Sequence, residues 1–559
     1  MHSSLPYTTR CYFSKFPILE RSMITIMRHQ IPLNKWDFSI ESLNYHTSVM
    51  LPHTWNVDDA VQHYRGPATY ETTVQPEEFL KGKKAYLSFG AVYHHARVYV
   101  NDTLVGEHGR SGHTPFRFDI TDCLVFGRKN HICVVADNTK QENMLPHMGD
   151  FDWADDGGIT RKVTLEFSEP DGIEFLHVAE ELTETENGYC SGTLTLNTAF
   201  LDGKPHSGTV KIIDYADNRI VLQKEITNIE HKITLCFEHL KTWDTTHPNL
   251  YRIALETEHD YCEVRTGLRK IEVCGEKILL NNQEIFLKGC EWMPGSHPDY
   301  GMAEPLSHSI KCLSQLKNSG CVFTRFHWQQ DASLFDWCDE NGLLVQEEIP
   351  YWGYPKEATS LQLEIAKQQA DEMVFFHKNH PSIAFWGVGN ELNGASEETI
   401  DYVEQMSAYF KAKDSRRLVN YVSNTLSLNQ NIDKDDATLH GDVAMWNDYL
   451  GFWEPCDDVE SHALRTAAKC KGMPLVVSEF GLCEPHFKGG DERRSEILKG
   501  RLELYSRIDN LKGYVWFSLN DYRTHVGEQG EGKFRQRVHG STDLYGNEKP
   551  SYALLRSMQ

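Results

Sequence analysis

Short runs in which hydrophobic and polar residues alternate follow one another between residues 30 and 168. Turn signals such as Asn101-Asp102 and Phe126-Gly127 separate these runs. Alternation with a period of two is typical of strands that bury one face. The pattern therefore predicts an N-terminal β jelly roll or sandwich over residues 30–169. Its clearest strands are expected at residues 68–74, 84–89, 96–100, 132–137 and 162–166.

Alternating runs also fill residues 170–272. About seven short strands in roughly 100 residues are typical of an immunoglobulin-like β sandwich. We therefore predict a second β domain over this range. Its strands are expected near residues 192–200, 209–214, 232–237 and 252–256.

The pattern changes after residue 272, where strand-length apolar runs alternate with longer amphipathic segments. Eight such runs with helices between them, in about 285 residues, are the arrangement of a (β/α)8 TIM barrel. A catalytic barrel is therefore predicted over residues 273–559. Its strands are expected at residues 285–292, 322–328, 343–349, 383–390, 418–423, 443–449, 475–480 and 514–520, and its helices include 307–318, 361–377, 397–413 and 493–507.

Charge, apolar runs and cysteine positions limit the kinds of partner and location that the protein is expected to have. The formal net charge of −24 disfavours nucleic acid and anionic membranes as partners. No apolar run reaches the roughly 18 residues that a membrane-spanning helix needs. The cysteines form no CxxC pair, and several, such as Cys236 and Cys321, lie in apolar segments, which favours reduced, buried thiols. Residues 1–29 form an N-terminal extension, whose basic residues interrupt any signal-peptide core. A cytoplasmic location is favoured, with a periplasmic or secreted one left open.

Two glutamates end predicted barrel strands, Glu391 after the fourth strand and Glu479 on the seventh. Catalytic groups of such barrels come from the C-terminal ends of the strands. Two carboxyls with different environments can act as acid and nucleophile, which is the requirement of glycoside hydrolysis. The alternative is that each carboxylate caps a helix or makes a structural ion pair. For the pair together we favour the catalytic interpretation.

Ordered sequence blocks carry a resemblance to a known family. In the barrel they are HPSIAFWGVGNEL at 380–392, VSEFG at 477–481 and GLLVQEEIP at 342–350. In the other domains they are LPHTW at 51–55, TPFRFDIT at 114–121, GGITR at 157–161 and GLRK at 267–270. Together they resemble glycoside hydrolase family 2, which contains β-galactosidases and β-glucuronidases, over about residues 30–559.

This resemblance implies a role for several residues. Glu391 would be the general acid/base and Glu479 the nucleophile of a retaining exo-glycosidase, which removes a terminal sugar through a covalent glycosyl-enzyme. Asn390 would bind the sugar 2-hydroxyl, and Tyr449 would hold the nucleophile. Two further residues would contact the sugar, with a structural role as the alternative for each: His327 and the pyranose platform Trp516.

Two more expectations from the resemblance have uncertain register. Asp152 matches a jelly-roll aspartate that reaches the active site in relatives, but Asp150, Asp155 and Asp156 are close neighbours. The second-strand block normally reads Arg-x-x-His, whereas Arg325 stands only two residues before His327. The role of Arg325 is therefore left open.

The terminal sugar has two interpretations. Relatives that cleave glucuronides carry an N-x-K-G motif after the eighth strand, and the corresponding stretch here is RVHG at 537–540. Loss of the motif favours a neutral sugar and a β-galactosidase-like enzyme. However, Arg537 lies among several basic residues, and arginine can bind a carboxylate with two parallel hydrogen bonds. A uronidase that uses Arg537 is the alternative, with an internal ion-pair network as the structural explanation of that cluster.

The remaining expectations concern ligands and assembly. The substrate is expected to be an oligosaccharide or other glycoside, although a non-catalytic carbohydrate-binding protein on the same scaffold is a competing class. No metal is predicted to be required. Magnesium, which many family members hold near the acid/base, is an option to which Glu347 and Glu348 could contribute. A homo-oligomer such as a dimer is left open.

Overall fold

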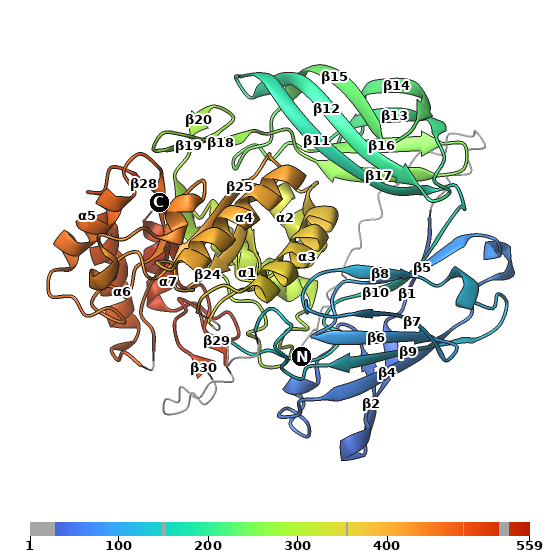
Figure 1. Cartoon of the computed structure of the whole chain (residues 1–559), viewed down its shortest axis with the longest axis horizontal. Helices are drawn as coiled ribbons and strands as arrows, with labels where there is room; N and C mark the ends of the chain where they lie inside the picture. The colour runs from blue at the N-terminus through green and yellow to red at the C-terminus, as the bar shows by residue number, and fades with distance from the viewer. Residues whose placement is uncertain (1–27, 148–152, 354–355, 485, 525–535, 559) are drawn as a thin grey trace, which may run out of the picture.

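The computed structural model describes residues 28–147, 153–353, 356–484, 486–524 and 536–558. These residues form a jelly-roll-like β domain, a β sandwich and a parallel barrel, as predicted (Figure 1). In Figure 1 the blue first domain and the green second domain both lie beside the barrel.

The first domain has two antiparallel sheets whose facing sides enclose an apolar core that includes Trp36, Trp55 and Phe89. Alternate residues along its strands are buried, as in β9 (Asn130–Asp137), which explains the period-two pattern. One sheet has the order β1 (His29–Pro32), β10 (Val163–Ser168), β5 (Lys84–Phe89), β8 (Phe116–Asp119), and the other β3 (Tyr45–Met50), β2 (Lys35–Ile40), β4 (Pro67–Val74), β9, β6 (His95–Val100), β7 (Thr103–His108).

The second domain is a sandwich of a three-stranded and a four-stranded sheet. Within the described residues it has seven strands, the number expected from the sequence. The sheets have the orders β11 (Ile173–Glu186), β12 (Tyr189–Phe200), β15 (Lys232–Lys241) and β14 (Ile220–Ile229), β13 (His206–Asp214), β16 (Tyr251–Thr257), β17 (Tyr261–Thr266).

The barrel closes through eight parallel strands. Every residue of β24 (Ile383–Asn390) is buried, because its two faces contact the barrel interior and the surrounding helices. The strands are β21 (Leu287–Cys290), β22 (Phe323–Phe326), β23 (Leu344–Glu348), β24 (Ile383–Asn390), β25 (Leu418–Ser423), β26 (Ala444–Asn447), β27 (Leu475–Phe480) and β28 (Leu511–Trp516).

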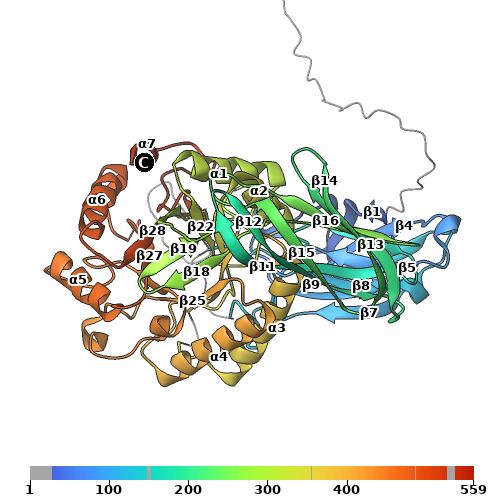
Figure 2. The same cartoon turned by 90° about the horizontal axis from the view of Figure 1, so that it is seen from above.

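Helices lie around the outside of this barrel (Figure 2). Those of the described residues are α1 (Leu306–Asn318), α2 (Ala332–Asn341), α3 (Ser360–His377), α4 (Glu397–Lys413), α5 (Val459–Lys469), α6 (Gly490–Tyr505) and α7 (Pro550–Ser557). A small sheet of β18 (Ile271–Cys274), β19 (Lys277–Leu280) and β20 (Gln283–Glu284) shares an apolar cluster with the barrel interior. The opposite, C-terminal ends of the strands are therefore where polar side chains gather.

One predicted strand is displaced. We expected the eighth strand at residues 514–520, but β28 ends at Trp516. Asn520 lies in the loop that follows, where its side-chain amide exchanges two hydrogen bonds of 3.0 Å with the backbone of Met293. The apolar residues next to Asn520 resemble a strand in sequence. The Asn520 side chain, however, bonds to a loop, and the segment does not join the hydrogen bonds between the barrel strands.

The sequence led us to expect reduced, buried thiols and no membrane-spanning helix, and the described residues can be compared with both expectations. All thirteen cysteines there are free, and Cys321 and Cys338 are buried as expected. Cys236 is exposed, which corrects the expectation, because alternate residues of its strand β15 face outward. Of the described helices, none combines the length and the apolar character that crossing a bilayer requires.

Candidate active site

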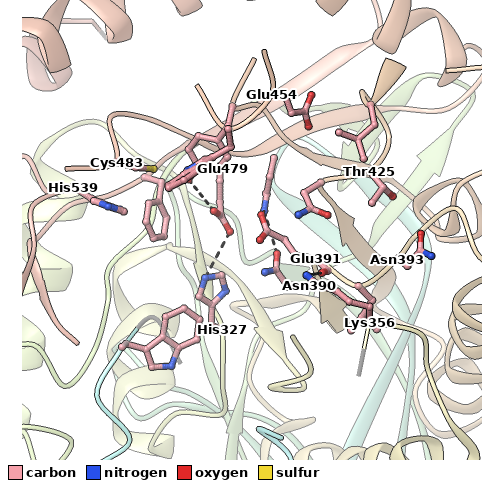
Figure 3. A pocket seen from close by; sticks show the side chains of 18 of the residues that line it. His327, Lys356, Asn390, Glu391, Asn393, Thr425, Glu454, Glu479, Cys483 and His539 are labelled. Carbon is pink, nitrogen blue, oxygen red and sulfur yellow. Dashed lines mark hydrogen bonds and ion pairs between the residues drawn. The ribbon is translucent and has the colours of Figure 1, made fainter. Parts of the chain in front are cut away.

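A cavity of about 670 Å³ opens at the C-terminal ends of the barrel strands. Both predicted catalytic glutamates line it, Glu391 directly after β24 and Glu479 on β27 (Figure 3). The other sequence-predicted residues that line it are Asn390, His327, Tyr449 and Arg537. The barrel therefore brings together side chains that lie more than 200 residues apart in the chain.

Glu391 occupies a left-handed backbone conformation with φ of 53°. This conformation is uncommon for a residue with a side chain, and such residues cluster at functional sites. Two backbone hydrogen bonds hold the turn: Asn390 N donates to Tyr351 O at 2.9 Å, and Glu391 N donates to Val422 O at 3.0 Å. The carboxylate accepts a hydrogen bond from Asn447 Nδ2 at 2.8 Å.

Glu479 is almost fully buried at 5% exposure, and two donors hold its carboxylate. Arg325 Nη1 donates to Oε1 at 2.7 Å, and the Tyr449 hydroxyl donates to Oε2 at 3.0 Å. Burial raises the pKa of Glu479 to about 7, while Arg325 acts in the opposite direction. The two donors thus stabilise the charged form that a nucleophile needs.

Arg325, whose role the sequence left open, is central to the site. Its guanidinium forms a two-bond pair with Glu348, at 2.9 and 3.0 Å, and also donates to Glu479 and to Asn390 Oδ1. Asn447 Nδ2 lies 3.2 Å from the same Asn390 oxygen. One hydrogen-bonded chain therefore connects the carboxylates of Glu479 and Glu391. Arg325 stands two residues before His327 instead of the three of the Arg-x-x-His block, and it still reaches the site.

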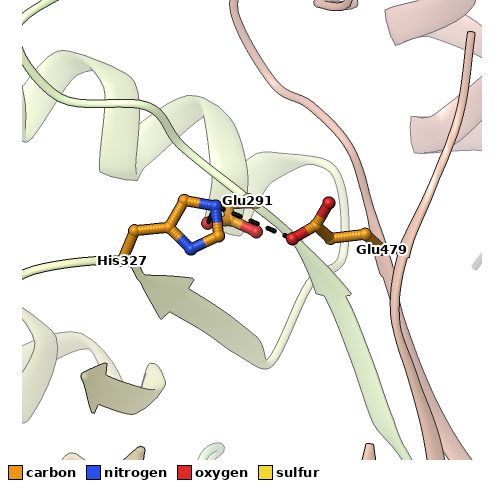
Figure 4. Close-up of side chains that lie close together, drawn as sticks. All are labelled: Glu291, His327 and Glu479. Carbon is orange, nitrogen blue, oxygen red and sulfur yellow. Dashed lines mark ion pairs between the residues drawn. The ribbon is translucent and has the colours of Figure 1, made fainter. Parts of the chain in front are cut away.

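Glu291, which sequence reasoning missed, lies close to His327 and Glu479 (Figure 4). It directly follows β21 and is fully buried. Its carboxyl lies 3.6 Å from Arg325 Nη1 and 3.4 Å from His327 Nε2, and neither oxygen has a hydrogen-bond partner among the described residues. Burial raises its pKa well above the usual range, more than Arg325 lowers it. Its position at a barrel strand end was the signal available in the sequence.

The site does not fit a metal ion. Ligand atoms of Glu291, His327 and Glu479 lie within 4.8 Å of one another. The Arg325 guanidinium, however, already contacts this group as its cation, at 2.7 Å from Glu479. The two residues named for the magnesium option have side-chain partners: Glu348 is paired with Arg325, and Glu347 with His377 at 2.9 and 3.0 Å.

The expected sugar platform Trp516 is not in the cavity. Its side chain is fully buried in the apolar layer between strands and helices, and its Nε1 donates to Ser541 Oγ at 3.0 Å. At this strand position the side chain points outward from the barrel, so the prediction for Trp516 is wrong. Trp153 of the first domain lines the cavity instead and stacks on His327, with ring centroids 4.8 Å apart.

Asp152 lies outside the described residues, although its neighbour Trp153 brings the first domain to the cavity. Of the three aspartates that could have taken its register, Asp150 also lies outside the described residues, and the other two have structural partners. Asp155 forms two hydrogen bonds with Arg65, at 2.8 and 2.7 Å, and Asp156 pairs with Arg523 at 2.6 Å. Arg523 is therefore part of an internal ion pair.

Arg537 and His539 line the cavity, and Figure 3 shows His539 on the side of Glu479. Arg537 is only 7% exposed and lies on β30 (Gln536–Arg537), which pairs with β29 (Tyr522–Arg523). His539 Nδ1 lies 3.4 Å from the Tyr522 hydroxyl. Burial and the nearby arginines lower the pKa of His539 well below its usual value, so Arg537 is the cation of this wall at neutral pH.

Two family models match the chain. The sugar binding domain of glycosyl hydrolases family 2 matches residues 29–169, and the TIM barrel domain of the same family matches residues 271–505. The chain therefore belongs to glycoside hydrolase family 2, which confirms the resemblance. It is a glycoside hydrolase with a catalytic barrel and two preceding β domains.

Relatives carry different names within this family. A β-glucuronidase of Bacteroides fragilis is 28% identical over 528 residues, which cover 86% of this chain and 74% of that protein. A β-galactosidase of Thermoanaerobacterium thermosulfurigenes is 28% identical over 564 residues, which cover 93% of this chain and 74% of that protein. Among solved structures, a β-galacturonidase from Eisenbergiella tayi bound to galacturonate has a TM-score of 0.81 at 23% identity. The match covers 96% of this chain and 98% of that one. That last likeness supports the fold alone.

Proposed function

We propose that the protein is a retaining exo-β-glycosidase in which Glu479 is the nucleophile. Its carboxylate attacks the anomeric carbon, and the bond to the leaving-group oxygen breaks as an ester to Glu479 forms. Arg325 and Tyr449 hold the carboxylate by both oxygens, so its orientation is fixed before substrate arrives. The observation that supports this proposal is the presence of both glutamates in one cavity.

Glu391 completes the proposed double displacement. It gives its proton to the departing oxygen and then removes a proton from the water that cleaves the ester. Asn390 and Asn447 lie between the two glutamates, and Asn390 is placed to bind the sugar 2-hydroxyl, where a hydrogen bond strengthens in the transition state.

For the sugar, we propose a hexuronic acid whose carboxylate is bound by Arg537. A guanidinium presents several donors in a fixed plane and matches a carboxylate with two hydrogen bonds. Arg537 supports this choice because it lines the cavity two residues before His539, and Figure 3 shows His539 on the Glu479 side, where the terminal sugar would lie. Histidine at 539 is neutral at that wall, so it can contact a sugar hydroxyl without adding charge.

A β-galactoside is the second candidate, and it was the first choice from the sequence. The missing N-x-K-G motif and the relatives named β-galactosidase favour it. In that case Arg537 would contact a neutral hydroxyl and contribute less to discrimination. The two candidates differ by a single carboxylate, so one arginine substitution separates them.

A panel of 4-nitrophenyl glycosides that includes β-galactoside, β-glucuronide and β-galacturonide tests the proposal. The uronides should be preferred, and Arg537→Met should lower kcat/KM on them by about 10–100-fold, as expected for hydrogen bonds to a charged group. Arg507→Met, on the surface, is the matched control. Preference for the galactoside, with no effect of Arg537→Met, would favour the second candidate.

The catalytic assignment has its own test. Glu479→Ala and Glu391→Ala should each lower kcat by on the order of 10⁴-fold, with unchanged thermal unfolding. Glu391→Ala should lose less on a dinitrophenyl glycoside than on a methyl glycoside, because a good leaving group needs no proton. Near-normal activity of either variant on every substrate would refute the assignment.

A further inference from the structure

The catalytic cavity continues beyond Glu391, on the side away from Glu479. In Figure 3, Thr425, Asn393 and Lys356 lie on one side of Glu391, while Glu479 and His327 lie on the other. A general acid protonates the oxygen that joins the two halves of a glycoside. Groups beyond the acid therefore face the leaving group. We define the outer subsite as the lining residues Lys356, Asn393 and Thr425 together with Asn424, which precedes Thr425, and the loop residues Trp453 and Glu454.

An exposed tryptophan forms one wall of the outer subsite. Trp453 is 46% exposed and lines the cavity. His486 and Phe487 support its ring, with centroid separations of 4.3 and 4.8 Å. A large apolar ring held in contact with water at the mouth of a cavity is a platform for a flat or C–H-rich ligand surface, such as one face of a pyranose.

Hydrogen-bond acceptors form a second wall. Glu454 is 9% exposed, and Ser427 donates to its Oε2 at 2.6 Å. Asn424 Oδ1 is buried and has no hydrogen-bond partner in the described parts of the chain. Buried polar atoms in native proteins are nearly always paired, so an orphan acceptor in a cavity wall indicates a ligand that donates. Sugar hydroxyls supply such donors.

The loop that carries Trp453 and Glu454 is tied to the catalytic machinery. Glu454 N donates to Tyr449 O at 3.3 Å, and Gly451 N donates to Glu454 O at 2.7 Å. Tyr449 in turn holds the nucleophile. This anchoring fixes the outer subsite relative to the reacting atoms.

We propose that the outer subsite binds a second sugar residue as the leaving group, so that the substrate is a disaccharide or the end of an oligosaccharide. The proposal rests on the glycosidase function proposed above. An apolar ring on one wall and acceptors on the other match a pyranose, which has an apolar face and a rim of hydroxyl donors. A flat apolar aglycone would use the Trp453 wall and leave Asn424 Oδ1 without a donor.

The first test compares two substrates that share the same terminal sugar, a β-linked disaccharide and the 4-nitrophenyl glycoside. Trp453→Ala and Glu454→Gln should each lower the ratio of their kcat/KM values, disaccharide over aryl glycoside, by tenfold or more. Phe79→Ala, which removes a 68% exposed ring on the first domain, is the control and should leave the ratio unchanged. An unchanged ratio in both subsite variants would overturn the proposal. If the wild type hydrolyses neither substrate nor any other glycoside, the proposed function itself is refuted.

The second test uses the outer subsite in the reverse direction. With an aryl glycoside as donor, the hydroxyl of an added monosaccharide replaces water. The ester bond to Glu479 breaks, a new glycosidic bond forms, and the hydroxyl proton goes to Glu391. The wild type should form more transfer product with the monosaccharide, as a disaccharide, than with 1-propanol at the same concentration. The Trp453→Ala variant should lose this preference. A wild type that prefers propanol would contradict the proposal.

Discussion

The two ends of the barrel hold two buried groups of charges that differ in their balance. At the C-terminal mouth, one arginine, Arg325, faces three glutamates, Glu291, Glu348 and Glu479. At the start of β24, Arg416 and Arg417 pair with two carboxylates, Asp414 and Glu180, and a third arginine, Arg269, donates to the carbonyl oxygen of Arg416. The first group has more acids than its cation can neutralise, and the second has more cations than acids.

The excess arginines at the base are satisfied by the backbone. Arg269 donates to the carbonyl oxygens of Pro381 and Ile383, at 2.9 and 2.6 Å. Arg417 donates to the carbonyls of Ile383 and His380. Because Glu180 belongs to the second domain, this network also joins that domain to the barrel. The base group therefore holds the structure together and leaves no reactive acid.

The excess acids at the mouth have no such compensation. Glu291 has no donor among the described residues, and Glu479 keeps its charge only through Arg325 and Tyr449. Carboxyls with strongly raised pKa values in a cavity are typical of catalytic sites. The same residue types thus stabilise one end of the barrel and make the other reactive.

The largest effect is expected from Arg325→Met, which removes the only cation of the mouth group. Loss of its contacts with Glu479 should lower kcat/KM by roughly 10³-fold. The pKa of Glu479 should rise further, because burial is then opposed only by Tyr449. The acid limb of the kcat/KM profile should move to higher pH. A profile that stays in place would show that Arg325 does not control the charge of the nucleophile.

The next effect concerns stability at the base. Asp414→Asn leaves Arg416 and Arg417 with reduced compensation and should lower the free energy of unfolding by about 3 kcal/mol. Burial opposes ionisation, yet Arg417 and then Arg416 hold the pKa of Asp414 well below its usual range. Its contribution is therefore complete above about pH 5 and lost as the pH falls.

Urea unfolding at pH 7 and at pH 3 measures this contribution. The difference between wild type and Asp414→Asn should shrink at pH 3. The kcat of folded Asp414→Asn should equal that of the wild type. A loss of kcat without a change in urea midpoint would contradict the division between the two ends.

The smallest effect comes from two amide substitutions on opposite sides of Arg325. Burial raises the pKa of Glu291 well above its usual range, so Glu291→Gln, which imitates a neutral carboxyl, should leave the acid limb within about 0.3 pH unit of the wild type. Glu348→Gln removes an anion that competes for Arg325, so the pKa of Glu479 should fall. The acid limb should then move about one unit to lower pH. Equal shifts in both variants would show that Glu291 also carries charge.

Much of this architecture could be predicted from the sequence because the barrel strands are continuously apolar. The strands β24, β25 and β27 have the predicted bounds, and both glutamates follow from them. The prediction for Trp516 was wrong because neighbouring residues of a strand point to opposite faces, and the sequence does not state which face is the cavity. Glu291 was missed because the first strand was expected to run to residue 292, which placed Glu291 inside it, whereas β21 ends at Cys290. Trp453 was missed because only packing brings it to the site.

Covalent trapping of the nucleophile tests the central claim most directly. A 2-deoxy-2-fluoro glycoside of the preferred sugar, with a good leaving group, should form an ester that is hydrolysed slowly, since fluorine destabilises the positively charged transition states. Mass spectrometry of the digested protein should find one sugar per chain on the peptide that contains Glu479. A label on any other residue, or steady turnover without a label, would contradict this account.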